Sequence, residues 1–142
     1  MALAEAALSF EGVPFRLQGR DPAHGLDCIG LVLASLAQLG IRPALPADYR
    51  ALRRDVLIPS ATLRSAGLVE TREPHRTGTI ALMRTAPTQA HAAIAVPQGR
   101  IVHAHAGLRR VVVSPRPDHW PILAAWRLGP ETVPEGDTAW QR

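Results

Sequence analysis

Cys28 stands at the start of an apolar run and is the chain's one thiol. Asp27, directly before it, is a residue type typical of a helix N-cap, and apolar residues recur at helical spacing from Leu31 to Leu39 until Gly40 ends the run. A thiol at a helix N-terminus is exposed to the macrodipole and to free N–H groups, which lower its pKa and favour the reactive thiolate. The same N–H groups can stabilise the oxyanion of a tetrahedral intermediate. The position predicts a nucleophile that needs a base.

The number of cysteines limits the alternatives. A single cysteine excludes an intramolecular disulfide and a zinc ribbon built from several cysteines. A lone cysteine is most often an inert core residue, because free cysteines are among the most frequently buried residues. The histidines therefore decide between a core thiol and a nucleophile.

A hairpin between two expected strands determines which histidines share a face. Residues 91–96 and 100–105 both alternate as strands do, and the loop between them contains Pro97 and Gly99. Pro97 suits the second position of a type I turn and Gly99 suits the left-handed position that follows it. A three-residue loop of this kind pairs Val96 with Arg100. That register predicts that the three histidines of the two strands lie on one face.

Those histidines are His91, His103 and His105. A base with a second polar residue behind it generalises the logic of the catalytic triad to Cys-His-His. Together with Cys28 the three histidines also carry ligand types that suit zinc, and this alternative stays open. It ranks lower because no short ligand pair anchors it.

The remaining elements predict an α+β fold in which N-terminal helices pack on a five-stranded antiparallel sheet. Helices are expected over residues 2–10, 28–39, 60–66 and around 47–54, and strands over residues 79–84, 91–96, 100–105, 109–114 and 122–128. Residues 16–27 are expected to form a loop. We expect one domain over residues 1–128 and a polar tail over residues 129–142, with the tail as a docking segment for a partner.

Composition excludes several classes of protein. With 142 residues the chain has room for one domain, and no apolar run approaches the length of about 20 residues that a membrane helix needs. The N-terminus lacks a basic region and contains Glu5, which argues against a signal peptide and predicts synthesis in the cytoplasm. The 16 basic residues are scattered arginines, the net charge is +4 and aromatic residues make up 4% of the chain, so nucleic-acid binding is not expected.

Two blocks of sequence resemble a known family. Residues 26–32, LDCIGLV, resemble the Asp-Cys-x-Gly-Leu-Val signature of the NlpC-type papain-like cysteine peptidases of bacterial cell walls. The segments HAAIAV from His91 and RIVHA from Arg100 resemble the family's catalytic-histidine strand and the next strand, whose histidine orients the first. The resemblance covers about residues 2–128 and implies a papain-like fold and no cofactor.

The resemblance also implies roles for individual residues. Cys28 would be the nucleophile, His91 the base and His103 the residue that orients the base. Asp27 would hold the free amine of the substrate. His105 is a rival to His103, because the expected register places it directly across from His91.

Two positions depart from the family pattern. Phe15 falls where many members have a tyrosine whose hydroxyl serves the substrate site, and Ile29 replaces a common serine after the nucleophile. Phe15, with Asp27 and His105, completes the substrate-binding residues that we expect. The departures concern specificity rather than the Cys-His-His set. Trp120 and Trp126 are interpreted as core or interface aromatics.

The resemblance implies hydrolysis of a stem-peptide amide in peptidoglycan through a thioester, at the bond between D-glutamate and diaminopimelate. The residues 19–21 (GRD) and the Trp-Pro and Trp-Arg pairs near the end of the domain look most like the peptidases of phage tails and gene transfer agents. Such a protein is a component of a particle, bound at the tail tip to hub or fibre proteins, and acts in the periplasm of the target cell. The alternative is a catalytically silent tail-tip subunit with a structural or peptidoglycan-binding role.

Overall fold

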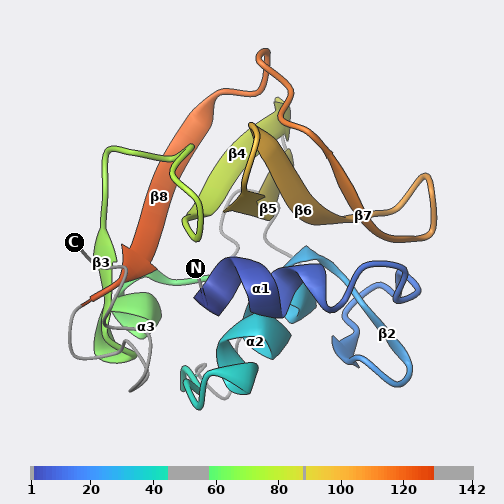
Figure 1. Ribbon diagram of the computed structural model, residues 1–142, viewed down its shortest axis with the longest axis horizontal. Coiled ribbons are helices and arrows are strands. Elements are labelled where there is room, and N and C mark those ends of the chain that lie inside the picture. Colours follow the sequence, from blue (N-terminus) through green and yellow to red (C-terminus); the bar gives the residue numbers. More distant parts are fainter. Residues whose placement is uncertain (1, 45–57, 88, 130–142) are drawn as a thin grey trace.

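The computed structural model describes residues 2–44, 58–87 and 89–129 (Figure 1). The helices are α1 (Ala2–Leu8), α2 (Cys28–Gln38) and α3 (Ser60–Ser65), and the strands are β1 (Arg20–Asp21), β2 (Gly25–Leu26), β3 (Leu68–Glu70), β4 (Ile80–Ala86), β5 (Gln89–Val96), β6 (Arg100–His105), β7 (Arg110–Pro115) and β8 (Ile122–Leu128). Helices α1 and α2 lie side by side below the sheet, and α3 lies next to β3. This arrangement confirms the predicted α+β architecture of N-terminal helices packed on an antiparallel sheet.

The main sheet has one strand more than predicted. Its order is β3-β8-β4-β5-β6-β7, and every neighbouring pair is antiparallel. The prediction of five strands was wrong because β3 has only three residues, too few to show an alternating pattern. It pairs with β8, with Leu68 opposite Leu128. Strands β1 and β2 are a second departure, since they form a small ribbon inside the segment expected to be a loop.

The helices cover one face of the sheet and form the larger core. Leu3 of α1 and Leu36 of α2 are buried together with Ile94 and Val102 from the central strands. The alternating residues of the same strands form a smaller cluster on the opposite face. That cluster consists of Ala81, Met83, Ala93 and Ile101, with Trp120 and Ile122 packed against it. His91 and His103 belong to this second face by alternation.

The β5–β6 hairpin has the predicted register and a different turn. Val96 pairs with Arg100, which confirms the three-residue loop. Gln98 and Gly99 both have positive φ, 70° and 68°. A type I turn needs negative φ at the position of Gln98, so the predicted turn type was wrong. The loop length alone determines the side-chain faces, and they are unchanged.

Helix α2 begins at Cys28 as predicted, because Asp27 is its N-cap. The Asp27 backbone is extended, with φ −97° and ψ −171°, and its Oδ1 accepts a hydrogen bond of 2.8 Å from the Gly30 amide. The helix ends at Gln38, and Gly40 follows with a φ of 78°. The cap therefore determines where the thiol stands: at the first residue of a helix whose initial N–H groups lack intrahelical partners.

Gly30 allows the segment before β1 to lie directly on α2. A Cβ atom at this position would overlap the carbonyl oxygen of Gly19, which is backbone and cannot rotate away. The Asp27 amide also donates to the Gly19 carbonyl, at 3.4 Å. Position 30 must therefore be glycine for the segment before β1 to pack here.

We expect Gly30→Ala to lower the free energy of unfolding by about 1–3 kcal/mol, because the added methyl group overpacks the contact with Gly19. Alanine otherwise stabilises a helix interior relative to glycine by up to about 1 kcal/mol, so the sign of the change is diagnostic. Urea denaturation measures it, with Ala37→Gly in the same helix as the control for helix propensity alone. A Gly30→Ala protein as stable as the wild type would contradict the close packing.

Two predicted segments lie outside the described residues. These are the short helix around residues 47–54 and the polar tail apart from residue 129. The helix at residues 60–66 corresponds to α3. Among the described residues, no helix is long and apolar enough to cross a membrane.

Candidate active site

Cys28 opens onto a cavity at the junction of α2 with the sheet. The cavity has a volume of about 460 Å³, within the range of small-ligand sites. The thiol is half-buried, and it lies against the backbone of Ala92 in β5. All six residues expected at the site line this one cavity: Phe15, Asp27, Cys28, His91, His103 and His105. The tertiary structure thus gathers residues that the sequence separates by up to 90 positions.

The base and its expected partner form a direct hydrogen bond. His91 Nε2 lies 3.0 Å from His103 Nδ1, and the two rings are nearly perpendicular, with an interplanar angle of 84°. This bond leaves Nδ1 of His91 as the ring nitrogen that can accept a proton from a thiol. The geometry favours His91 as base and His103 as the residue that orients it.

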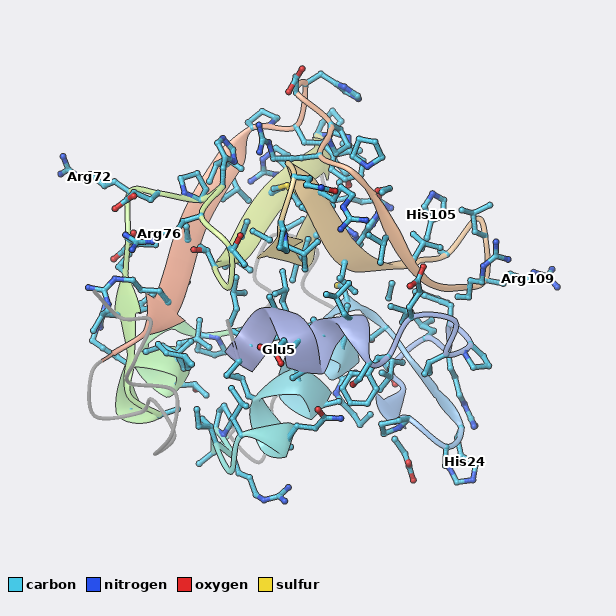
Figure 2. The ribbon with its side chains drawn as sticks, in the orientation of Figure 1. Glu5, His24, Arg72, Arg76, His105 and Arg109 are labelled. Carbon is cyan, nitrogen blue, oxygen red and sulfur yellow. The ribbon has the colours of Figure 1, made fainter. Side chains whose placement is uncertain are left out.

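His105 does not take the place of His103. Its Nδ1 accepts a hydrogen bond of 3.0 Å from the Leu108 amide in the β6–β7 turn, beside which Figure 2 shows it. The ladder between β5 and β6 ends at the pair Ile94 and Val102, so the strands diverge before His91 reaches His105. The expectation that His105 stands directly across from His91 was therefore wrong, although both side chains lie on the same face.

Ser114 of β7 is a site residue that the sequence reasoning missed. Its Oγ lies 2.9 Å from His103 Nε2 and 3.3 Å from the carbonyl oxygen of Pro115. In the β6–β7 register Ser114 pairs with Ile101, which makes it the diagonal neighbour of His103 on the same face. A prediction of the β6–β7 register would have identified Ser114, but the turn over residues 106–109 contains no sequence signal that fixes this register.

Trp120 is the second residue missed. Its ring lies edge-on to both histidines, with centroid distances of 5.8 Å to His91 and 6.2 Å to His103. It also lines the cavity. The interpretation as a core aromatic is confirmed for Trp126, which is 1% exposed. Half-buried Trp120 packs against the smaller core cluster and also contacts the histidine pair.

Asp27 uses both carboxylate oxygens within the protein. Oδ1 accepts from the Gly30 amide and, at 2.7 Å, from Nη1 of Arg20, while Oδ2 accepts from the Gln18 amide at 2.9 Å. The side chain is buried and the Arg20 side chain is partly exposed. The role of Asp27 in holding a substrate amine stays a prediction, and its role in this structure is to anchor the loop at the start of α2.

Burial of the thiol reverses the expected direction of its pKa shift. Burial, with a smaller contribution from the charge of Asp27, raises the pKa of Cys28 to about 11. The backbone of Ala92 and of Ile29 favours the thiolate, but these contacts do not outweigh the loss of solvent. Loss of solvent, rather than the helix N-terminus, dominates the ionisation of Cys28.

The histidine pair is neutral for the same reason. Burial, with smaller contributions from the neighbouring His103 and His105, lowers the pKa of His91 to about 4. Burial and the charge of His105 also lower the pKa of His103 to about 4. At neutral pH the structure therefore favours a neutral thiol beside a neutral imidazole.

A neutral pair predicts slow alkylation of Cys28 by iodoacetamide at neutral pH. With a pKa of about 11 instead of 9.0, the thiolate fraction at neutral pH is lower by about a hundredfold. The rate should rise about tenfold per pH unit from about pH 6 to about pH 10. Mass spectrometry of alkylated protein, with glutathione as the control thiol, measures it. A fast rate that does not change between about pH 5 and pH 8 would instead indicate a thiolate–imidazolium pair.

The zinc alternative finds no support in the geometry. In the part of the chain that the structure describes, no three His, Cys, Asp or Glu side chains are arranged to hold a metal ion. Both ring nitrogens of His103 have hydrogen-bond partners, His91 and Ser114. His105 directs its Nδ1 to a backbone amide.

His24 lies outside the cavity despite its place shortly before Cys28. It is exposed at the outer end of the β1–β2 turn, and its Nδ1 lies 3.3 Å from Asp21 Oδ2 (Figure 2).

Comparison with known proteins agrees with this fold. The model of the NlpC/P60 family matches residues 12–122. No curated protein sequence matches the chain. Among solved structures, NlpC2 from Trichomonas vaginalis is similar with a TM-score of 0.63, 19% identity and coverage of 89% of this chain and 44% of NlpC2.

Two proteins of Mycobacterium tuberculosis have the same fold. The peptidoglycan hydrolase RipB matches with a TM-score of 0.54, 24% identity and coverage of 89% of this chain and 62% of RipB. RipD, a non-catalytic NlpC/p60 domain protein adapted to peptidoglycan binding, matches with a TM-score of 0.56, 19% identity and coverage of 89% and 93%. The chain spans less than half the length of NlpC2 and less than two thirds of RipB. Identities this low show a shared fold, so any inference about activity must come from the residues of the site.

Proposed function

The chain belongs to the NlpC/P60 family, and from that premise we propose that it is a cysteine peptidase that hydrolyses a stem-peptide amide of bacterial peptidoglycan. The observation that carries the proposal is the hydrogen bond between His91 and His103 in the cavity that Cys28 lines. A structural thiol would need no oriented base beside it. The three residues supply a nucleophile, a base and an orienting group.

The proposed reaction starts from the neutral pair. As the sulfur of Cys28 attacks the amide carbonyl carbon, Nδ1 of His91 takes the thiol proton, so that charge develops only in the transition state. The oxyanion forms next to the first N–H groups of α2, which point towards the cavity end of the helix. The C–N bond then breaks, and His91 returns the proton to the leaving amine.

The product of the first half-reaction is a thioester between Cys28 and the acyl part of the stem peptide. Water then attacks the thioester carbonyl, with His91 accepting one proton of the water and returning it to the sulfur. The C–S bond breaks and a carboxylic acid is released. The edge-on ring of Trp120 limits the access of bulk solvent to the histidine pair.

We assign the bond between D-glutamate and diaminopimelate as the cleaved bond, on the resemblance of the two motif blocks to the NlpC-type peptidases. Digestion of purified diaminopimelate-type peptidoglycan by the wild-type protein and by Cys28→Ala tests both the reaction and the bond. Mass spectrometry of the released fragments identifies the cleaved amide. Fragments from the wild type alone, ending in D-glutamate, are the expected result.

Absence of fragments from both proteins would contradict the proposal and favour the alternative of a catalytically silent peptidoglycan-binding subunit. RipD, which is described as non-catalytic and adapted to peptidoglycan binding, has the same fold. The raised pKa of Cys28 also favours the silent subunit, because it leaves little of the thiol ionised. Co-sedimentation with insoluble peptidoglycan then distinguishes a binding protein from a subunit with no affinity for the wall. In that experiment Cys28→Ala should sediment as the wild type does.

For its biological setting, we propose a component of a phage-like particle that opens peptidoglycan during DNA delivery, bound to hub or fibre proteins at the tail tip. The support is the likeness of residues 19–21 and of the two tryptophan pairs near the end of the domain to such peptidases. Detection of the protein in purified particles, with cleaved peptidoglycan in the periplasm of the target cell, is the expected result. Its absence from particles would overturn the assignment without affecting the peptidase activity.

A further inference from the structure

The side chains of β5, β6 and β7 form a continuous chain of hydrogen bonds that runs away from the thiol. His91 Nε2 lies 3.0 Å from His103 Nδ1, and His103 Nε2 lies 2.9 Å from Ser114 Oγ. The chain ends where Ser114 Oγ lies 3.3 Å from the carbonyl oxygen of Pro115. His103 therefore uses a different ring nitrogen for each of its two neighbours, whereas Ser114 uses its one side-chain oxygen for both.

The bond at the Pro115 end of this series favours one direction. A carbonyl oxygen only accepts hydrogen bonds, so in the bond to Pro115 the donor is the single hydroxyl proton of Ser114. With that proton directed to Pro115, the lone pairs of Ser114 Oγ accept from His103, and the hydrogen between Ser114 and His103 belongs to Nε2 of His103. A neutral imidazole with a proton on Nε2 has a bare Nδ1.

The same reasoning carries through the next bond. The bare Nδ1 of His103 accepts the hydrogen bond from Nε2 of His91, so that His91 too carries its proton on Nε2. Nδ1 of His91 is then unprotonated. Hydrogen bonds that ran in the opposite direction would place a proton on Nδ1 of His91 and leave His91 unable to accept the thiol proton.

We propose that Ser114 is a positioning residue that fixes the tautomers of His103 and His91, so that Nδ1 of His91 is unprotonated and ready to receive the proton of Cys28. The catalytic part of this inference depends on the proposed peptidase function. The tautomers themselves are a property of the resting protein. They can be measured whether or not the protein hydrolyses peptidoglycan.

Nitrogen-15 NMR of the imidazole rings in the full chain at neutral pH measures the tautomers directly. At this pH both histidines are neutral, because burial lowers both pKa values to about 4. The wild type should show His91 and His103 each protonated on Nε2. Ser114→Ala should show a mixture of tautomers at both rings, and Ser114→Thr, which keeps a hydroxyl, should restore the wild-type pattern. Ser65→Ala at the exposed end of α3 is the control.

Kinetics give the second measurement. Ser114→Ala should lower kcat by about tenfold with little change in KM, since the loss concerns one hydrogen bond behind the base and no substrate contact. Ser114→Thr should stay within about twofold of the wild type. A wild-type His103 protonated on Nδ1, or unchanged tautomers and kcat in Ser114→Ala, would overturn the inference. If the wild type shows no hydrolysis but has the expected tautomers, the peptidase proposal fails while the positioning role of Ser114 stands.

Discussion

For the proposed peptidase, replacing His91 by alanine is expected to lower kcat/KM for peptidoglycan stem peptides by about 10³- to 10⁴-fold. Because burial raises the pKa of Cys28 to about 11, almost none of the thiol is ionised at neutral pH, and attack depends on proton transfer to a base. His91 is the histidine that lines the cavity and has its ring oriented by His103. Without His91, only the small fraction of Cys28 that is already ionised at neutral pH can attack the substrate.

The measurement is release of fragments from diaminopimelate-type peptidoglycan over time, with folding checked by circular dichroism. His24→Ala is the matched control, because His24 is exposed at the β1–β2 turn and lies outside the cavity. It should leave the rate unchanged. A decrease of less than about tenfold in His91→Ala would show that another group takes the thiol proton.

The activity should also have an acid limit set by the same residue. Burial lowers the pKa of His91 to about 4, so protonation removes the base only below about that pH. The folded protein binds this proton less tightly than the unfolded chain does. Stability from neutral His91 is therefore present above the ordinary pKa of 6.5 and is lost as the pH falls towards the lowered value.

Replacing Asp27 by alanine is expected to lower the free energy of unfolding by about 3 kcal/mol. The substitution removes the N-cap of α2 and leaves the Gln18 amide and the Arg20 guanidinium without their partner. The cap alone contributes about 1 kcal/mol. Arg20 is partly exposed and regains water, which keeps the loss at the lower end of the range for a buried ion pair.

Urea denaturation of Asp27→Ala and of Asp21→Ala separates this site from a surface carboxylate. Asp21 is exposed at the end of β1, where it pairs with His24 and accepts from the Ala23 amide, so its replacement should lower the free energy of unfolding far less than that of Asp27. A double-mutant cycle with Arg20→Gln isolates the contribution of the ion pair. Equal stabilities of Asp27→Ala and Asp21→Ala would show that the carboxylate of Asp27 does not hold the loop to the helix.

The elements around the nucleophile were predictable because their signals are local. Asp27, the apolar spacing from Leu31 and Gly40 predict where α2 begins and ends, and α2 begins at Cys28 as they predict. The three-residue loop between β5 and β6 predicts the pairing of Val96 with Arg100, since loop length and strand period determine which side chains share a face. Capping and hairpin register act over a few residues, so the sequence expresses them directly.

The sequence by itself determined the α+β architecture, the position of the thiol at a helix N-terminus and the shared face of the three histidines. Only the tertiary structure decided which histidine meets His91, because the choice depends on where β5 and β6 diverge rather than on their register. It also decided the roles of Ser114 and Trp120, which reach the pair from β7 and from the turn before β8. The tertiary structure also decided the ionisation of Cys28. A helix N-terminus favours the thiolate, but packing of the sheet against α2 buries the thiol, and this burial raises its pKa and keeps it protonated.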